Sequence, residues 1–118
     1  MAEYQGSCHC GAVRFSYSGE EITRGLRCNC SMCSRKGAMM SAEMIPEANL
    51  QVDADPKDVG LYQFGKKTAK HYFCRNCGVY THHETARKAG HYRVNLGCVE
   101  GVDCFTLETD VFDGAHLL

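Results

Sequence analysis

Three cysteines lie within six positions of the stretch RCNCSMCSRKG, which covers residues 27–37. The spacing Cys28-x-Cys30-x-x-Cys33 is typical of metal ligands in proteins that keep their thiols reduced. Three thiolates leave one position of a tetrahedral zinc ion for an exchangeable ligand, which is the usual arrangement of a catalytic site. Their combined charge makes the metal a weak Lewis acid toward water and suits it to a soft ligand such as a thiolate. The triplet therefore predicts an open zinc site that binds a thiol.

Two further cysteine pairs predict a second zinc site, which is closed. Cys8-x-Cys10 and Cys74-x-x-Cys77 are each followed by a glycine. In such a knuckle the loop turns backbone N–H groups toward the sulfurs, and the two pairs together fill the four corners of a tetrahedron. Zinc at this site would close a long loop and stabilise the fold, much as a disulfide does. The alternatives are a redox CxxC motif or buried free cysteines, and the helix that a thioredoxin-like motif requires is not evident after Cys77.

The triplet has an alternative interpretation as a second structural site. It would then take a fourth ligand from elsewhere in the chain, and the candidates are His71, His82, His83, Cys98 and Cys104. The nine cysteines could also be divided differently between the two sites. Spacing favours the open site over these alternatives by a small margin.

Basic residues flank the triplet, where three thiolates carry more negative charge than one zinc ion neutralises. Arg27, Arg35 and Lys36 could offset this charge. We expect Arg35 or Lys36 also to hold an anionic substrate beside the open site.

The remaining histidines and cysteines are expected to have ordinary structural roles. His82 and His83 are adjacent in an expected strand, so only one can face a given pocket, and we expect the pair to face solvent. His9 is expected at the surface or packed on a sheet rather than as a metal ligand. Cys98 and Cys104 are expected to be small buried hydrophobic residues, with Cys98 in a turn that could border the pocket.

Length and composition restrict the class of protein. The 118 residues fit a single zinc-binding domain over residues 1–118. A formal net charge of -1 argues against a nucleic-acid or anionic-membrane binder, and no apolar stretch approaches the roughly 20 residues of a membrane span. The odd number of cysteines, and an N-terminus without a basic start and an apolar run, predict a reduced, cytoplasmic protein without structural disulfides.

The elements that must position these ligands are predicted to be mostly antiparallel β-strands. Val13, Phe15 and Tyr17 alternate with polar residues, which predicts a half-buried strand that ends at Gly19. Strand composition marks six further segments, which are residues 39–45, 49–55, 60–65, 69–74, 78–83 and 91–99.

Helix is expected to be scarce. One short helix could begin with Ser31 as its cap and carry Cys33. The other candidate is the stretch ETARKAG, residues 84–90, with Gly90 as its end.

Four segments that contain these motifs, GSCHCGAVRF, RCNCSMCSRKG, YFCRNCGVY and RVNLGCVEG, resemble in order and spacing the glutathione-dependent formaldehyde-activating enzyme family. The similarity runs from Gly6 to about Gly114. It implies a β-tent, a fold of antiparallel sheets stapled by zinc that is shared with a small exchange factor for Rab GTPases. It also implies a structural zinc on Cys8, Cys10, Cys74 and Cys77, and a second, labile zinc on Cys28, Cys30 and Cys33.

The resemblance implies an activity, a carbon–sulfur lyase that joins formaldehyde and glutathione to give S-hydroxymethylglutathione. The expected partners are therefore a small thiol such as glutathione and a small aldehyde, and the enzyme would mainly bring them together. The rival hypothesis is a non-catalytic zinc-binding adaptor or exchange-factor-like module on the same fold. The triplet favours the enzyme, because a purely structural module needs no open metal site. No oligomeric state is predicted.

Overall fold

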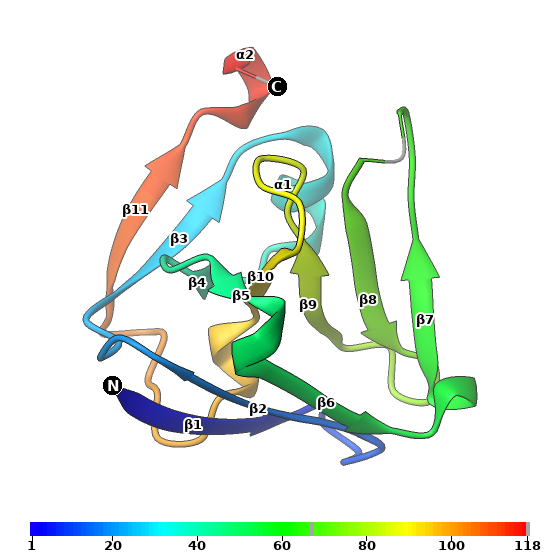
Figure 1. The fold of residues 1–118 in the computed structure, drawn as a ribbon. Helices are drawn as coiled ribbons and strands as arrows, with labels where there is room; N and C mark the ends of the chain where they lie inside the picture. Colours follow the sequence, from blue (N-terminus) through cyan, green and yellow to red (C-terminus); the bar gives the residue numbers. More distant parts are fainter. Residues whose placement is uncertain (67, 118) are drawn as a thin grey trace.

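Three small sheets and a few short helices make up the fold, which a computed structural model describes for residues 1–66 and 68–117 (Figure 1). The first sheet has the order β1-β2-β6 and contains β1 (Ala2–Ser7), β2 (Val13–Gly19) and β6 (Leu50–Ala54). The second has the order β5-β10-β9-β8-β7 and contains β5 (Ile45–Pro46), β10 (His91–Val94), β9 (Tyr80–Glu84), β8 (Lys70–Cys74) and β7 (Val59–Tyr62). The third has the order β11-β3-β4 and contains β11 (Glu108–Phe112), β3 (Arg24–Cys28) and β4 (Met40–Ser41). The predicted class, mostly β with little helix, is confirmed.

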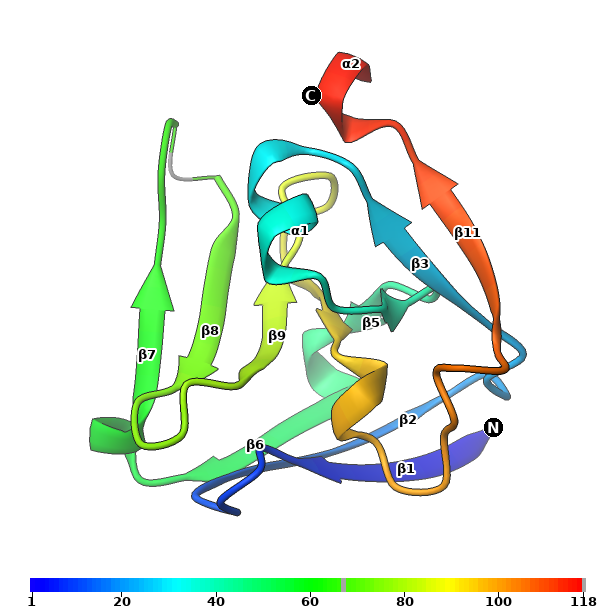
Figure 2. The ribbon, with the colours of Figure 1, turned by 180° about the vertical axis from the view of Figure 1, so that it is seen from behind.

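The first sheet forms a base from which the other two rise. Figure 1 shows β1, β2 and β6 across the bottom of the view, β7, β8 and β9 rising on one side, and β3 and β11 rising on the other. The short helix α1 (Ser31–Lys36) lies between these two arms, and the view from behind in Figure 2 agrees. The segment that carries the cysteine triplet is thus held between two sheets.

The alternating pattern of β2 is confirmed and directs its side chains into two separate clusters. Phe15 and Tyr17 are each 3% exposed and pack in the main core, whose other buried members are Met39, Ile45, Val94, Leu96 and Val99. Val13 is fully buried and packs with Cys8 and Cys74 in a second, smaller cluster. One strand therefore links the main core to a cluster that contains predicted metal ligands.

One strand pair departs from the antiparallel expectation. β11 pairs with β3 in parallel, from Glu108 opposite Arg24 to Phe112 opposite Cys28. Parallel strands need a long connection, and here most of the domain lies between the two strands. The Arg24 guanidinium donates two hydrogen bonds to Asp110 across this pair, at 2.8 and 2.7 Å. The sequence analysis did not predict β1, β3 or β11, whereas the other strand pairs are antiparallel as expected.

The predicted helix after Cys28 forms, but its cap differs from the prediction. The N-cap of α1 is Cys30, whose Sγ accepts a hydrogen bond from the backbone N–H of Cys33. Ser31 is instead the first residue of the helix. Gly37 ends the helix in a left-handed conformation with φ 68°, and its N–H donates to the Cys33 carbonyl.

The second predicted helix, over residues 84–90, is wrong, because the segment is a turn that joins β9 to β10. Side chains satisfy its backbone locally: Thr85 accepts from the Arg87 N–H, and Glu84 accepts from the Gly90 N–H. Such bonds compete with a helix for the same N–H groups. The predicted strand over 39–45 is divided into β4 and β5 by a bend.

The remaining helical elements are single turns. They are the 3-10 helices η1 (Glu47–Asn49), η2 (Pro56–Asp58) and η3 (Leu96–Cys98), and the C-terminal α2 (Gly114–Leu117). Within the described residues, no helix is long and apolar enough to cross a membrane.

Candidate metal sites and cavity

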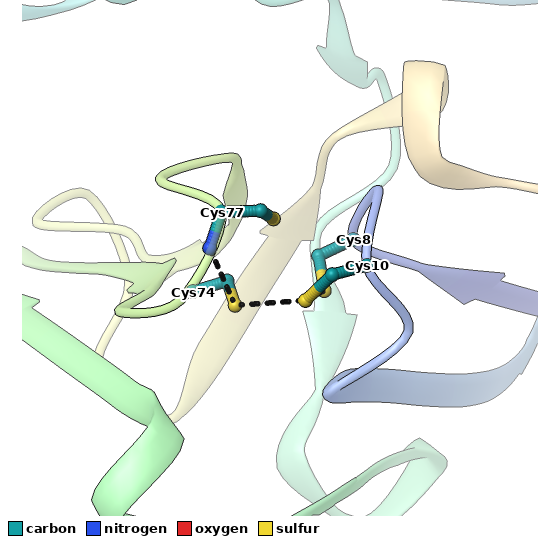
Figure 3. A group of neighbouring side chains, drawn as sticks. All are labelled: Cys8, Cys10, Cys74 and Cys77. Carbon is teal, nitrogen blue, oxygen red and sulfur yellow. Dashed lines mark hydrogen bonds between the residues drawn. The ribbon is translucent and has the colours of Figure 1, made fainter.

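The four outer cysteines meet where two loops approach each other (Figure 3). Cys8 and Cys10 come from the loop between β1 and β2, Cys74 is the last residue of β8, and Cys77 lies in the loop between β8 and β9. Their Sγ atoms all lie within 4.8 Å of one another, and the Cys8–Cys10 and Cys10–Cys74 pairs are each 3.7 Å apart. A tetrahedral zinc ion with sulfur ligands at 2.3 Å has S···S edges of about 3.8 Å. The two 3.7 Å distances match such an edge, so the donor set suits zinc.

The two loops of this cluster are built alike. In each, the first cysteine donates its N–H at 2.9 Å to a valine carbonyl five residues later, Cys8 to Val13 and Cys74 to Val79. In each, a glycine with positive φ makes the turn, 84° at Gly11 and 79° at Gly78, which glycine adopts without steric cost. The shared geometry points both pairs of thiols at one centre.

Backbone N–H groups turn toward these sulfurs, as the knuckle spacing predicts. Val13 donates to Cys8 Sγ at 3.3 Å, and Asn76 and Cys77 donate to Cys74 Sγ at 3.3 and 3.4 Å. Burial opposes ionisation of the Cys77 thiol, but hydrogen bonds from the Val79 and Cys10 N–H groups lower its pKa to about 6. The loop thus favours the thiolate form of Cys77, the form that binds a metal.

The triplet forms a second group of three sulfurs. Cys28 ends β3, Cys30 caps α1 and Cys33 lies within α1, and their Sγ atoms all lie within 4.8 Å of one another. No fourth metal-ligating atom among residues 1–66 and 68–117 joins this group, so the proposed ligands His71, His82, His83, Cys98 and Cys104 lie outside it. The structure therefore separates the seven cysteines into a group of four and a group of three, as the spacing predicts.

The C-terminal segment holds the triplet loop in place. Asn29, between the first two ligands, donates its backbone N–H to Phe112 and its side-chain amide to Asp113, and its Oδ1 accepts from the Ala115 N–H. These bonds are 3.2, 3.0 and 2.9 Å long. The parallel pairing of β11 with β3 places these partners beside the loop, and sequence reasoning missed this support.

The triplet opens into a cavity of about 270 Å³ between the two arms of the fold. Its lining combines the three thiols with Met32, Met40, His71, His83, Arg93 and Phe112. Residues with more exposed side chains complete the rim, among them Phe64, Lys66 and Arg87. The other cysteine group does not line this cavity, so of the two candidate metal sites it is the triplet that borders this space.

Of the two basic residues proposed to hold substrate, Lys36 lines the cavity. Its Nζ lies 4.3 Å from the centre of the Tyr80 ring, in a cation–π contact. Burial lowers the pKa of Lys36, while the thiols of the triplet, Cys33 foremost, act in the opposite direction. Arg35 lies on the exposed side of α1, where its Nη1 donates to the Ser31 carbonyl at 2.8 Å.

The expectation that His82 and His83 face solvent is wrong, because β9 runs between β8 and β10 and both residues are buried, 4% and 8% exposed. His83 lies opposite His71 of β8, and both line the cavity. His82 packs elsewhere, stacked on Tyr72 with ring centres 4.6 Å apart and with its Nδ1 2.8 Å from the Thr81 hydroxyl. The expectation that only one of the pair faces a given pocket is confirmed.

Arg93, which the sequence does not single out, is 5% exposed and lines the cavity, with its Nη1 donating to the Ser41 and Ala42 carbonyls at 2.8 and 2.7 Å. These partners lie about 50 residues away in the chain, so no local pattern reveals them. Cys98 does not border the cavity; it packs against the main core and its thiol approaches the Tyr80 carbonyl at 3.8 Å. His9 is exposed, as expected.

Comparison with known proteins agrees with this architecture. The model of the glutathione-dependent formaldehyde-activating enzyme family matches residues 3–114. The crystal structure of a Rhodobacter sphaeroides protein, a Northeast Structural Genomics target, is similar with a TM-score of 0.81 and 37% sequence identity, over 92% of this chain and 99% of that chain. The family match spans both cysteine groups and nearly all the strands that carry them. The chain belongs to the glutathione-dependent formaldehyde-activating enzyme family.

Proposed function

We propose that this protein is a zinc-dependent carbon–sulfur lyase that joins formaldehyde and glutathione to S-hydroxymethylglutathione in the cytoplasm. Membership of the family supports formaldehyde activation with glutathione at the level of the family. The observation that carries the proposal for this chain is the three-thiol group in the wall of a cavity, with no fourth ligand among the described residues. Three protein ligands and an exchangeable position are typical of catalytic rather than structural zinc.

Cys8, Cys10, Cys74 and Cys77 would hold one zinc ion, and Cys28, Cys30 and Cys33 would hold the other. Zinc on the triplet would supply a position at which an incoming thiol binds as the more nucleophilic thiolate. Backbone N–H groups of the loop would assist the ligands: the Cys30 N–H donates to Cys28 Sγ at 3.5 Å, and the Cys33 N–H donates to Cys30 Sγ at 3.4 Å. The cap of α1 would therefore be part of the metal site.

The walls of the cavity provide the remaining functions. Lys36 offsets the negative charge of the triplet and is positioned to attract the anionic tripeptide. Lys66 and Arg87 at the rim add cations that suit its two carboxylates. Confinement of thiol and aldehyde in about 270 Å³ supplies the proximity that an addition reaction needs. Arg35, outside the lining, remains a weaker candidate for the same role.

Exchange spectroscopy of ¹³C-formaldehyde with glutathione tests this proposal. The protein with both sites loaded should accelerate formation of the hydroxymethyl adduct over the uncatalysed rate, and Cys28→Ser should abolish the acceleration. Cys104→Ser is the matched control, because Cys104 lies outside both groups. If the loaded protein binds two zinc ions yet neither binds glutathione nor accelerates exchange, the chain is instead a non-catalytic zinc module on this fold.

A further inference from the structure

Three buried polar atoms lack a hydrogen-bond partner in the described part of the chain: Lys36 Nζ, His71 Nε2 and His83 Nδ1. All three residues line the cavity that contains the triplet. Buried polar side chains are almost always paired, and an unpaired group is costly unless something else binds it. Because the three residues line one cavity, a ligand bound there could supply the missing partners.

Neighbouring strands hold the two imidazoles side by side. His71 of β8 lies directly opposite His83 of β9, and their ring centres are 5.5 Å apart. The other nitrogen of His71, Nδ1, lies 2.6 Å from the Tyr80 hydroxyl. When that hydroxyl donates to Nδ1, the proton of the neutral ring is on Nε2, which then becomes a hydrogen-bond donor. In that arrangement Tyr80 orients His71 and presents its Nε2 as a donor.

The pair of imidazoles lines the same cavity as the triplet. Lys36 also lines this cavity, and its charge interacts with both groups: with the three thiols of the triplet and with His71 and His83. Neither histidine belongs to the group of sulfurs within 4.8 Å, so they are not ligands of that site in the structure. Burial, with the nearby charge of Lys36, lowers the pKa of His71 to about 4, which keeps the ring neutral at neutral pH.

We propose that His71 Nε2 and His83 Nδ1 form a binding site for the oxygen atom of the aldehyde and of the hydroxymethyl product. This inference rests on the proposed function. As the thiolate sulfur bonds to the carbonyl carbon, the π electron pair of the C=O bond moves onto oxygen. The oxygen then takes up one proton from solvent, equal to the proton that the thiol released. Two N–H donors fixed beside this oxygen would stabilise its developing negative charge.

The test compares two ligands that differ only at this oxygen. S-Hydroxymethylglutathione, formed by mixing glutathione with formaldehyde, carries a hydroxyl where S-ethylglutathione carries a methyl group. Calorimetric affinities for both are measured with the zinc-loaded wild type and with His83→Phe, which removes Nδ1 without breaking a hydrogen bond of the protein. His71→Phe provides a second variant, and His83→Leu replaces His83→Phe if the larger ring prevents folding.

The wild type should prefer the hydroxymethyl ligand about tenfold, the combined effect of two modest hydrogen bonds. The His83 and His71 variants should each reduce this preference to about threefold, because one donor remains, with zinc content unchanged. His82→Phe is the matched control, because the same change on the same strand lies away from the cavity and should keep the preference.

A preference that is undiminished in the folded His83 and His71 variants, or that is absent from the wild type, overturns the inference. A preference that depends on the histidines in a protein that does not accelerate formaldehyde exchange supports the oxygen site and contradicts the proposed reaction. A wild type that binds neither ligand contradicts both.

Discussion

The two cysteine groups differ most in the distance along the chain between their members. The group of four joins loops that are 64 residues apart and connects the first sheet to the second. The triplet comes from six consecutive positions and joins only β3 to the adjacent α1. In the group of four, Cys8 and Cys74 are buried in a small apolar cluster, 3% and 0% exposed, and Cys10 is exposed, whereas the triplet opens into a cavity.

We therefore expect the group of four to contribute to folding stability and the triplet to contribute to the reaction. Closing a long loop removes much conformational entropy from the unfolded chain, so metal in the group of four would act on folding. Metal in the triplet would close a short loop that α1 and the C-terminal segment already hold, so we expect its loss to remove the proposed reactive site and to leave the scaffold.

Cys74→Ser should have the largest effect. Structural zinc contributes on the order of 10 kcal/mol of apparent binding free energy, comparable to the whole stability of a typical domain. We therefore expect loss of the cooperative thermal transition in circular dichroism. Cys104→Ser, outside both groups, should melt within a few degrees of the wild type. A cooperative Cys74→Ser protein with a near-normal melting temperature would show that the group of four is not a staple.

Cys30→Ser should abolish thiol-dependent activity and leave the fold intact. Serine is a good N-cap, so the bond from the Cys33 N–H to the side chain of residue 30 is retained while a metal ligand is lost. Elemental analysis should find about one zinc fewer per chain. If Cys30→Ser unfolds as readily as Cys74→Ser, the triplet is structural and the contrast between the groups disappears.

His82 should give the scaffold an acid sensitivity that is independent of the cavity. Burial lowers the pKa of His82 to about 4, while an unfolded histidine titrates near pH 6.5. Between these values the unfolded chain binds a proton that the folded chain does not, so stability falls as pH drops through this window. The loss attributable to His82 approaches about 3 kcal/mol at pH 4.

Replacing this residue isolates its contribution from other effects of acid. His82→Gln can keep a hydrogen bond with Thr81 but cannot titrate. Denaturant unfolding at pH 7 and pH 4.5 should therefore show a smaller loss of stability in His82→Gln than in the wild type. Equal losses in the two proteins would show that burial of His82 does not set this pH dependence.

The smallest expected effect is a change in glutathione affinity, which shows whether Lys36 or Arg35 attracts this ligand. Lys36→Met should weaken glutathione binding about tenfold, because it removes one charge-assisted contact in the cavity. Arg35→Met is the matched control on the same helix and should change the affinity less than about twofold, since Arg35 lies outside the cavity lining. Calorimetry with glutathione gives both values. A larger loss in Arg35→Met would restore Arg35 to the site.

Sequence reasoning succeeded where local spacing carries the information. The periods of CxC, CxCxxC and CxxC separate the seven thiols correctly, and the alternation of Val13, Phe15 and Tyr17 identifies β2. Strand-rich composition also located β8 and β9. In each case neighbouring positions in the chain determine which side chains face the same way.

It failed where partners lie far apart in the chain. The parallel pairing of β11 with β3 joins segments about 80 residues apart in the chain. This pairing places Asp113 where it accepts a hydrogen bond from the Asn29 side chain. His83 is buried because β9 lies between β8 and β10, and Arg93 is buried because its guanidinium donates to a carbonyl of the distant Ser41. No local sequence pattern encodes either relationship. The sequence therefore could not predict that a nitrogen of His83 is buried without a hydrogen-bond partner.

Native mass spectrometry during titration with a zinc chelator tests the central contrast most directly, because the mass reports bound zinc and the charge-state distribution reports folding. The account predicts a chain with two zinc ions that first becomes a one-zinc species with compact charge states, as the triplet is emptied. Only loss of the second ion should give the broad, highly charged distribution of an unfolded chain. Simultaneous loss of both ions, or an unfolded one-zinc species, would contradict the division of the seven cysteines into a staple and a reactive site.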